Sequence, residues 1–129
     1  MIYVSCNSLL SGTGKVVTRL EYQAYSKLAI QTIASIIKES RRFPTQSTHS
    51  LGLQAAPIIR CAAYHRLGVV PVGEPSIVIA VSSPHRKEAF QACEYILEEV
   101  KLKAQIWKKE YYEGDKEEEA VWKANCDHH

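Results

Sequence analysis

Two adjacent basic residues, His85 and Arg86, follow a run of apolar residues and stand next to Ser83 and Pro84. Serine is a good helix N-cap and proline suits the first helical position, so a helix is expected to begin here. Backbone N–H groups at a helix start attract an anion, arginine can bind a phosphate through two hydrogen bonds, and histidine can exchange a proton near neutral pH. The pair therefore indicates a phosphate or carboxylate site. The alternative is a solvated first turn without a ligand.

Lys101 is the second group that could do chemistry. It lies eleven residues after Phe90, or three helical turns, and is expected on the face of the apolar stripe Phe90, Cys93, Leu97 and Val100. A half-buried lysine can serve as an acid, a base or a nucleophile. Lysines are also common in last helical turns, where they complement the helix dipole and extend into solvent. Taken alone, the position favours this second interpretation.

Lys108, Lys109 and Glu110 lie within residues 106–112, which are expected to form a strand. Consecutive side chains of a strand point to opposite faces, so one lysine could face a site while the other faces water. The alternative is an exposed strand whose charges protect the edge of a sheet.

Several of these basic groups are expected to converge on one site for a small phosphorylated anion. The sequence contains no evident carboxylate pair, metal-ligand cluster or Ser/His/Asp set that would indicate another chemistry. The spacing alone does not distinguish a binding site from a catalytic one. The convergent groups are His85, Arg86, Lys101 and Lys108.

The composition is that of an ordinary globular domain. The chain has 129 residues, 46% of them hydrophobic and 23% charged, and a formal net charge of +2. This charge is too small to indicate a nucleic acid or a membrane surface as partner. The four cysteines form no C-x-x-C pair, and neither a secretory signal nor an apolar run of about 20 residues is evident. A cytoplasmic protein with reduced thiols in the cytosol is expected.

The elements that would position the basic groups follow from periodicity. Residues 15–25 alternate like a half-buried strand, and residues 26–40 have the period of an amphipathic helix capped by Ser26. The β-branched run 76–81 predicts a strand buried on both faces, and a second helix should extend from Pro84 to residues 101–104. Further strands are expected at 58–64, 69–72 and 106–112, with a loop at 45–57.

This order favours an α+β fold with a mainly antiparallel sheet and two main helices. The domain is expected at residues 16–125. Residues 1–15 are expected to form an irregular or truncated N-terminal segment.

Three segments resemble the large, catalytic subunit of molybdopterin synthase, and the resemblance extends from about residue 16 to residue 122. The first is SSPHRKEAFQACEYILEEVKLKAQIWKKE, at 82–110, with the family's SS-HR-x-x-AF-x-A pattern and a close match to its P-I-W-K-K-E segment. The others are LEYQAY at 20–25 and YHRLGVVPVGEPSIVIAVSS at 64–83.

The resemblance implies an α/β hammerhead fold and a dimer within a heterotetramer. Each large subunit of the family binds a small ubiquitin-like partner, whose C-terminal Gly-Gly tail carries a thiocarboxylate. Sulfur passes from this tail to cyclic pyranopterin monophosphate in two rounds, giving molybdopterin. No metal or organic cofactor, no nucleic acid and no membrane is implied for this step.

The family's functional residues match this chain position by position. By this match Lys101 is the catalytic lysine, supported by Lys108, and His85 with Arg86 is a substrate-binding pair. The substrate-binding residues implied are His85, Arg86, Lys101, Lys108, Lys109 and Glu110.

The chain also departs from the family pattern at three places. The family has G-T-x-R before LEYQAY, whereas here Gly12-Thr13 is followed by Gly14-Lys15 and the arginine is missing. The segment 45–57 is longer than the usual connection. Position 105 is glutamine where the family usually has proline, which should relax the turn after the helix and shift Lys101 slightly relative to Lys108.

Three functions are consistent with these features. The first is the sulfurtransferase, favoured by the four basic groups together. The second is a family member that binds the small subunit without completing the reaction, favoured by the missing arginine. The third is a nucleic-acid-binding domain, indicated only by Tyr111 and Tyr112 beside the lysines of the last strand, and it ranks last.

Overall fold

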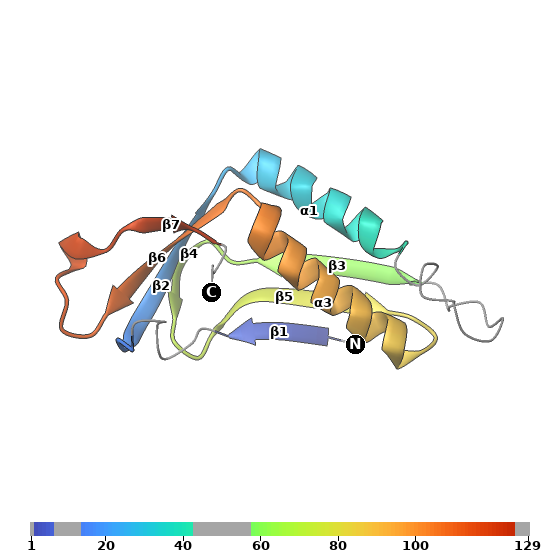
Figure 1. The fold of residues 1–129 in the computed structure, drawn as a ribbon, viewed down its shortest axis with the longest axis horizontal. Coiled ribbons are helices and arrows are strands. Elements are labelled where there is room, and N and C mark those ends of the chain that lie inside the picture. Colours follow the sequence, from blue (N-terminus) through green and yellow to red (C-terminus); the bar gives the residue numbers. More distant parts are fainter. Residues whose placement is uncertain (1, 7–13, 43–57, 126–129) are drawn as a thin grey trace.

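Two antiparallel sheets and two long helices make up the computed structural model, which describes residues 2–6, 14–42 and 58–125 (Figure 1). The predicted α+β class, with a mainly antiparallel sheet and two main helices, is confirmed. The three-stranded sheet has the order β1-β5-β3, with bounds Ile2–Cys6, Pro75–Ser82 and Arg60–His65. The four-stranded sheet has the order β4-β2-β6-β7, with bounds Gly68–Pro71, Val17–Ala24, Ile106–Tyr112 and Trp122–Ala124.

Helices α1 (Ser26–Ser40) and α3 (Arg86–Lys103) lie together on one face of the three-stranded sheet (Figure 1). A short 3-10 helix, η1 (Glu117–Glu119), precedes β7. Among the described residues, no helix has the length and apolar character needed to cross a membrane.

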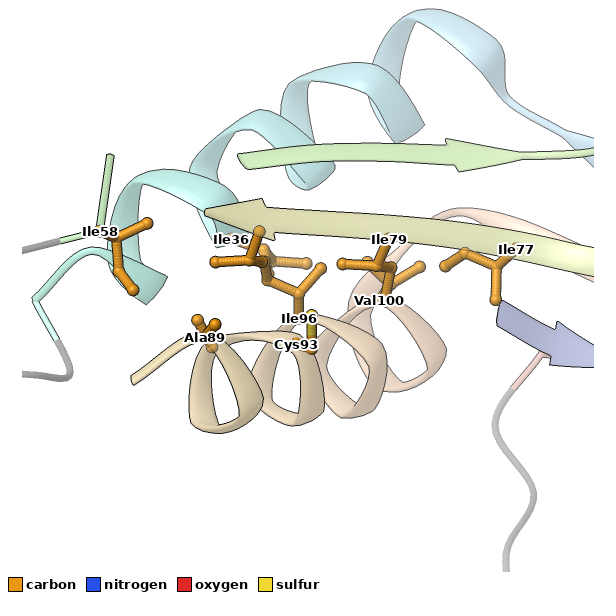
Figure 2. Close-up of a cluster of buried hydrophobic side chains, with 10 residues drawn as sticks. Ile36, Ile58, Ile77, Ile79, Ala89, Cys93, Ile96 and Val100 are labelled. Atoms are coloured by element: carbon orange, nitrogen blue, oxygen red, sulfur yellow. The ribbon is translucent and has the colours of Figure 1, made fainter. Parts of the chain in front are cut away.

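The first core cluster fills the space between the helices and β5 (Figure 2). Ile79 of β5 and Ile96 of α3 are fully buried, and Ile36 brings α1 into the same cluster. The prediction that β5 is buried on both faces is only half right. Alternate residues face the core because β5 is a strand, whereas Val78 and Ala80 on its other face are partly exposed.

The second core cluster lies against the four-stranded sheet, and a bulge decides which residues of β2 enter it. The register of β2 against β6 shifts between Val17 and Arg19. As a result Val17 is buried and Val16 is exposed, although strict alternation would put Val16 on the same face as Leu20 and Tyr22. Beyond the bulge the expected parity holds, and Leu20 and Tyr22 are buried.

Part of the N-terminal segment is ordered as a strand, which corrects the expectation that residues 1–15 are irregular. Strand β1 pairs with β5 in antiparallel register, from Ile2 opposite Ala80 to Cys6 opposite Pro75. The pairing needs only backbone N–H and C=O groups, and it covers the edge of β5 that β3 leaves open. Residues 7–13 and the predicted loop 45–57 lie outside the described residues.

The helix starts and one helix face also differ from expectation. Ser26 is the first residue of α1 rather than its cap, and α3 begins at Arg86, two residues beyond Pro84, with His85 as N-cap. The expected inward residue Phe90 is 53% exposed. The buried residues of α3 lie on a helix face that is rotated from the expected one, so Phe90 lies at the margin of that face. That face contains Ala89, Ala92, Cys93, Ile96 and Val100.

A buried polar contact joins the two sheets. Tyr22 of β2 donates a hydrogen bond to the Ser76 hydroxyl of β5 at 3.0 Å, and its ring meets the His65 ring edge-on at 4.7 Å. His65 Nδ1 lies 2.7 Å from the Arg66 carbonyl oxygen, which can only accept, so Nδ1 carries the proton. Nε2 can then accept from the Asn125 amide at 3.4 Å. This arrangement requires a neutral imidazole, and burial lowers the pKa of His65.

The lowered pKa of His65 predicts that the fold loses stability in mild acid. The unfolded histidine titrates near its ordinary value of 6.5 and the folded one lower, so the unfolded state binds more protons between the two values. The contribution is therefore present above pH 6.5 and is lost as the pH falls below it. Urea unfolding between pH 7.5 and 5 should show a smaller pH dependence for His65→Phe than for the parent. The exposed His85, changed to Phe, is the control; a parental slope in the His65 variant would contradict this assignment.

Candidate functional site

The predicted anion-binding pair lies at the start of α3, far from the predicted catalytic lysine. His85 and Arg86 are exposed, and the N-cap makes no side-chain hydrogen bond. Lys101 belongs to the last turn, fifteen residues after Arg86. At 1.5 Å per residue the two positions are about 22 Å apart along the axis. Within a single chain the four basic groups therefore do not converge, because the length of α3 separates His85 and Arg86 from Lys101.

Lys101 lies at the edge of the packed face of α3. It is half-buried and follows Val100, which is fully buried. Phe90 is exposed, so it does not mark the buried face as expected, yet Lys101 is half-buried. This position agrees with the first interpretation of Lys101 and not with the solvated one that its position alone favours. The next lysine, Lys103, is exposed and forms an ion pair with Glu99 one turn earlier. Lys103 therefore has the solvated last-turn position that was the alternative for Lys101.

The corner between α3 and β6 determines how Lys101 is placed relative to Lys108. Ala104 packs against both core clusters. The Gln105 carbonyl oxygen accepts a hydrogen bond from the Tyr25 amide at 3.0 Å, and its side-chain Oε1 accepts one from the Thr32 hydroxyl at 2.9 Å. The sequence predicts that Gln105, in place of the family's proline, relaxes the turn after α3. The structure adds a hydrogen bond to α1 that spacing could not indicate.

Lys108 is a buried lysine on the inner face of β6. It is 8% exposed, stands opposite Tyr22 of β2, and its Nζ lies 3.4 Å from Glu110 Oε1. The Tyr112 hydroxyl donates to the other oxygen of the same carboxylate. Lysines are rarely buried without a counter-charge, and Glu110 provides one here. A desolvated ammonium interacts more strongly with an anion than a solvated one does, which suits a binding or catalytic group.

Lys109 points to the opposite face, as the strand alternation predicted. Its Nζ lies 5.6 Å from the centroid of the Tyr111 ring and 5.4 Å from that of Trp122. The Arg19 guanidinium covers the same Tyr111 ring at 3.8 Å, and the Tyr111 hydroxyl donates to Glu21 at 2.7 Å. Lys109 is thus part of a cation–aromatic cluster on the outer face, and the predicted substrate-binding residues do not share one surface.

A cavity of about 350 Å³ lies near the end of the β2–β6 pair and borders Glu110 and Tyr112. Its charged residues neutralise one another: Lys15 pairs with Asp115 at 2.7 Å, and Arg19 pairs with Glu117 at 2.7 Å. This cavity contains neither predicted catalytic lysine. Its balanced charge does not fit the anion site expected from the sequence. Within the described residues, no group of three or more His, Cys, Asp or Glu side chains could hold a metal ion.

The sequence matches the family model described as MoaE protein over residues 9–103. It is 46% identical over 114 residues to the molybdopterin synthase catalytic subunit of Pyricularia oryzae, covering 88% of this chain and 54% of that protein. It is 41% identical over 112 residues to the molybdopterin synthase catalytic subunit of Oryza sativa subsp. indica, covering 87% of this chain and 50% of that protein. The chain thus spans about half the length of these relatives.

Two solved structures share the fold. The crystal structure of molybdopterin synthase from Staphylococcus aureus has a TM-score of 0.69 and 30% sequence identity, and the match covers 95% of this chain and 79% of that one. A complex of subunits 1 and 2 of the molybdopterin-converting factor from Helicobacter pylori has a TM-score of 0.62. Its identity is 17%, with 89% of this chain and 66% of that one covered, so this likeness concerns the fold alone.

The Lys108–Glu110 contact predicts a measurable stability effect. Glu110→Gln keeps the size and the acceptor for Tyr112 but removes the negative charge facing the desolvated ammonium. We expect the free energy of unfolding to fall by about 1–3 kcal/mol in urea titrations. The matched control is Asp115→Asn in the exposed Lys15–Asp115 pair, which should leave the free energy of unfolding nearly unchanged because solvent screens the pair. Equal losses in the two variants would show that burial adds nothing to the Lys108 contact.

Proposed function

Since this chain belongs to the MoaE protein family, we propose that it is the catalytic subunit of a molybdopterin synthase. In this proposal the subunit transfers sulfur from the thiocarboxylated C-terminus of a small ubiquitin-like protein to cyclic pyranopterin monophosphate. The names of the relatives from Pyricularia and Oryza support the assignment, and so does the Staphylococcus structure. The observation that carries it within the fold is that Lys101 and Lys108 flank one corner, one half-buried and the other buried beside a carboxylate.

We assign Lys101 the role of proton transfer or activation of the electrophilic carbon, because it is the half-buried amine at the edge of the packed face. Lys108 supports it as a fixed positive charge close to the reacting groups. Glu110 holds Lys108 in place through the contact at 3.4 Å. Lys109 lies on the outer face of β6, opposite to Lys108. It would contact the substrate only where this outer face forms part of the completed site.

We further propose that the site is completed by a second copy of the chain. A single α3 holds Arg86 about 22 Å from Lys101, which is longer than a small phosphorylated molecule. His85 and Arg86 of one copy would bind the phosphate and stabilise developing charge beside Lys101 and Lys108 of the other. This arrangement would also explain why His85 and Arg86 are exposed at the N-terminus of α3, where free backbone N–H groups can bind an anion.

We also propose that the small subunit docks near the lysine-bearing corner. The Helicobacter complex of two subunits of the molybdopterin-converting factor supports such a partner. Two large and two small subunits would then form a heterotetramer in the cytosol, with residues 16–125 as the domain responsible. The reaction as proposed needs no metal or organic cofactor.

A reconstitution tests the enzyme directly. The chain is mixed with a thiocarboxylated small subunit and cyclic pyranopterin monophosphate, and molybdopterin is measured. Lys101→Ala should lower the rate by at least about 100-fold, because a positioned proton-transfer group contributes this much or more. Lys103→Ala, in the same helical turn but exposed and paired with Glu99, is the matched control and should retain the parental rate. Partner binding without product in the parent chain would identify a non-catalytic binding protein instead.

Mixed dimers test whether two copies share a site. Arg86→Ala and Lys101→Ala are each expected to be nearly inactive alone. Coexpressed, half of the dimers contain one copy of each, and each such dimer has one intact site. The mixture should therefore recover roughly a quarter of the parental activity. A mixture as inactive as its components would place both residues in the site of a single chain and overturn the shared arrangement.

A further inference from the structure

Helix α1 is tied to the corner that joins α3 to β6. Two hydrogen bonds end on Gln105: the Tyr25 amide donates to its carbonyl oxygen at 3.0 Å, and the Thr32 hydroxyl donates to its side-chain Oε1 at 2.9 Å. The donors lie at the N-cap of α1 and about two turns into the helix, while the acceptor Gln105 lies two residues after the end of α3. The corner is thus held from one side by a helix distant in sequence.

The corner lies between two rigidly packed anchors. Val100 is fully buried in the first core cluster, and Ile106 is 3% exposed in the second. Lys101 directly follows the first anchor, and Lys108 lies two residues after the second. Positions 104 and 105 belong to neither helix nor strand, so their torsions set the position of one lysine relative to the other.

Thr32 is an unusual choice for this position in the helix unless its hydroxyl is used. Threonine is a weak helix former because its branched side chain loses rotamer freedom. Its hydroxyl commonly bonds back to the carbonyl one turn earlier. Here it is partly buried and donates to Gln105, which is 73 residues away in the sequence.

We propose that Thr32 is a positioning residue for sulfur transfer: by holding the Gln105 side chain, it fixes the corner that sets Lys101 against Lys108. The inference rests on the proposed function and extends it to α1, which contributes none of the predicted site residues. Neither Thr32 nor Gln105 touches substrate in this scheme. Their effect reaches the reaction through the geometry of the two lysines, where small displacements are costly.

The first test removes the hydroxyl while keeping the shape of the side chain. Thr32→Val should lower the kcat of the reconstituted enzyme about fivefold with little change in KM, as expected for the loss of one neutral hydrogen bond that orients a reacting group. Thr32→Ser restores the hydroxyl and should return kcat to near the parental value. The matched control is Thr18→Val on β2, whose hydroxyl donates to the Tyr111 carbonyl at 3.1 Å away from the corner, and its kcat should not change.

A second variant tests whether stiffness of the corner is what matters. Ala104 has φ −69° and ψ 141°, the extended conformation favoured by a residue that precedes proline. Gln105→Pro should therefore stiffen the corner without help from Thr32. We expect it to keep the parental kcat, and adding Thr32→Val to it should cause no further loss.

Amide hydrogen exchange gives a readout independent of activity. Thr32→Val should speed exchange at the Tyr25 amide, which donates to Gln105, while the Val100 amide inside α3 stays as protected as in the parent. Parental kcat together with parental exchange at Tyr25 would overturn the proposal. Faster exchange with unchanged kcat would limit Thr32 to a structural role and overturn it equally. If the parent chain makes no product, the proposed function is wrong. Amide exchange at Tyr25 would then still show whether Thr32 holds the corner between α3 and β6.

Discussion

The antiparallel pairing of β2 with β6 is the contact on which the rest of the structure depends. The ladder ends with Ala24 opposite Ile106, and the Tyr25 amide then bonds to the Gln105 carbonyl. Because one strand leads into α1 and the other is entered from α3, this pairing forces the two helices to lie side by side with opposite directions. Their packed faces then cover β5, and the last turn of α3 is brought to the junction of the two sheets (Figure 1).

The junction of the two sheets contains buried polar groups in addition to apolar side chains. Tyr22, Ser76 and Lys108 are all buried where the two sheets meet, so each needs partners to offset lost hydration. Tyr22 and Ser76 satisfy one another, and the Lys108 ammonium faces the Glu110 carboxylate. A purely apolar junction would pack as well. Under the proposed function, the buried ammonium would serve to attract an anion, because the low local dielectric strengthens that attraction.

The length of α3 imposes a second constraint on function. One end of the helix offers an exposed His–Arg pair at free N–H groups, and the other offers a half-buried lysine beside the packed core. The helix is rigid, so no side-chain motion brings the two ends together. Under the proposed function, a reaction that uses both ends would be organised between two chains, so activity would depend on assembly.

The sequence by itself determined the class of fold, most elements and the chemistry of the candidate residues. Its periodicities located α1, β2, β5 and β6, and strand alternation alone placed Lys108 and Lys109 on opposite faces. These features depend only on residues close together in the sequence. The geometry of a helix or a strand fixes the direction in which each of their side chains points. The family resemblance came from local motifs in the same way.

Only the tertiary structure decided which local options were realised. A bulge against β6 turned Val17 inward, the packed face of α3 excluded Phe90, and an open edge of β5 was paired by β1. The burial of Lys108 opposite Tyr22 and the bond from Thr32 to Gln105 depend on partners distant in the sequence. Local periodicity carries no information about such partners, because they meet only when the two sheets and the two helices have packed.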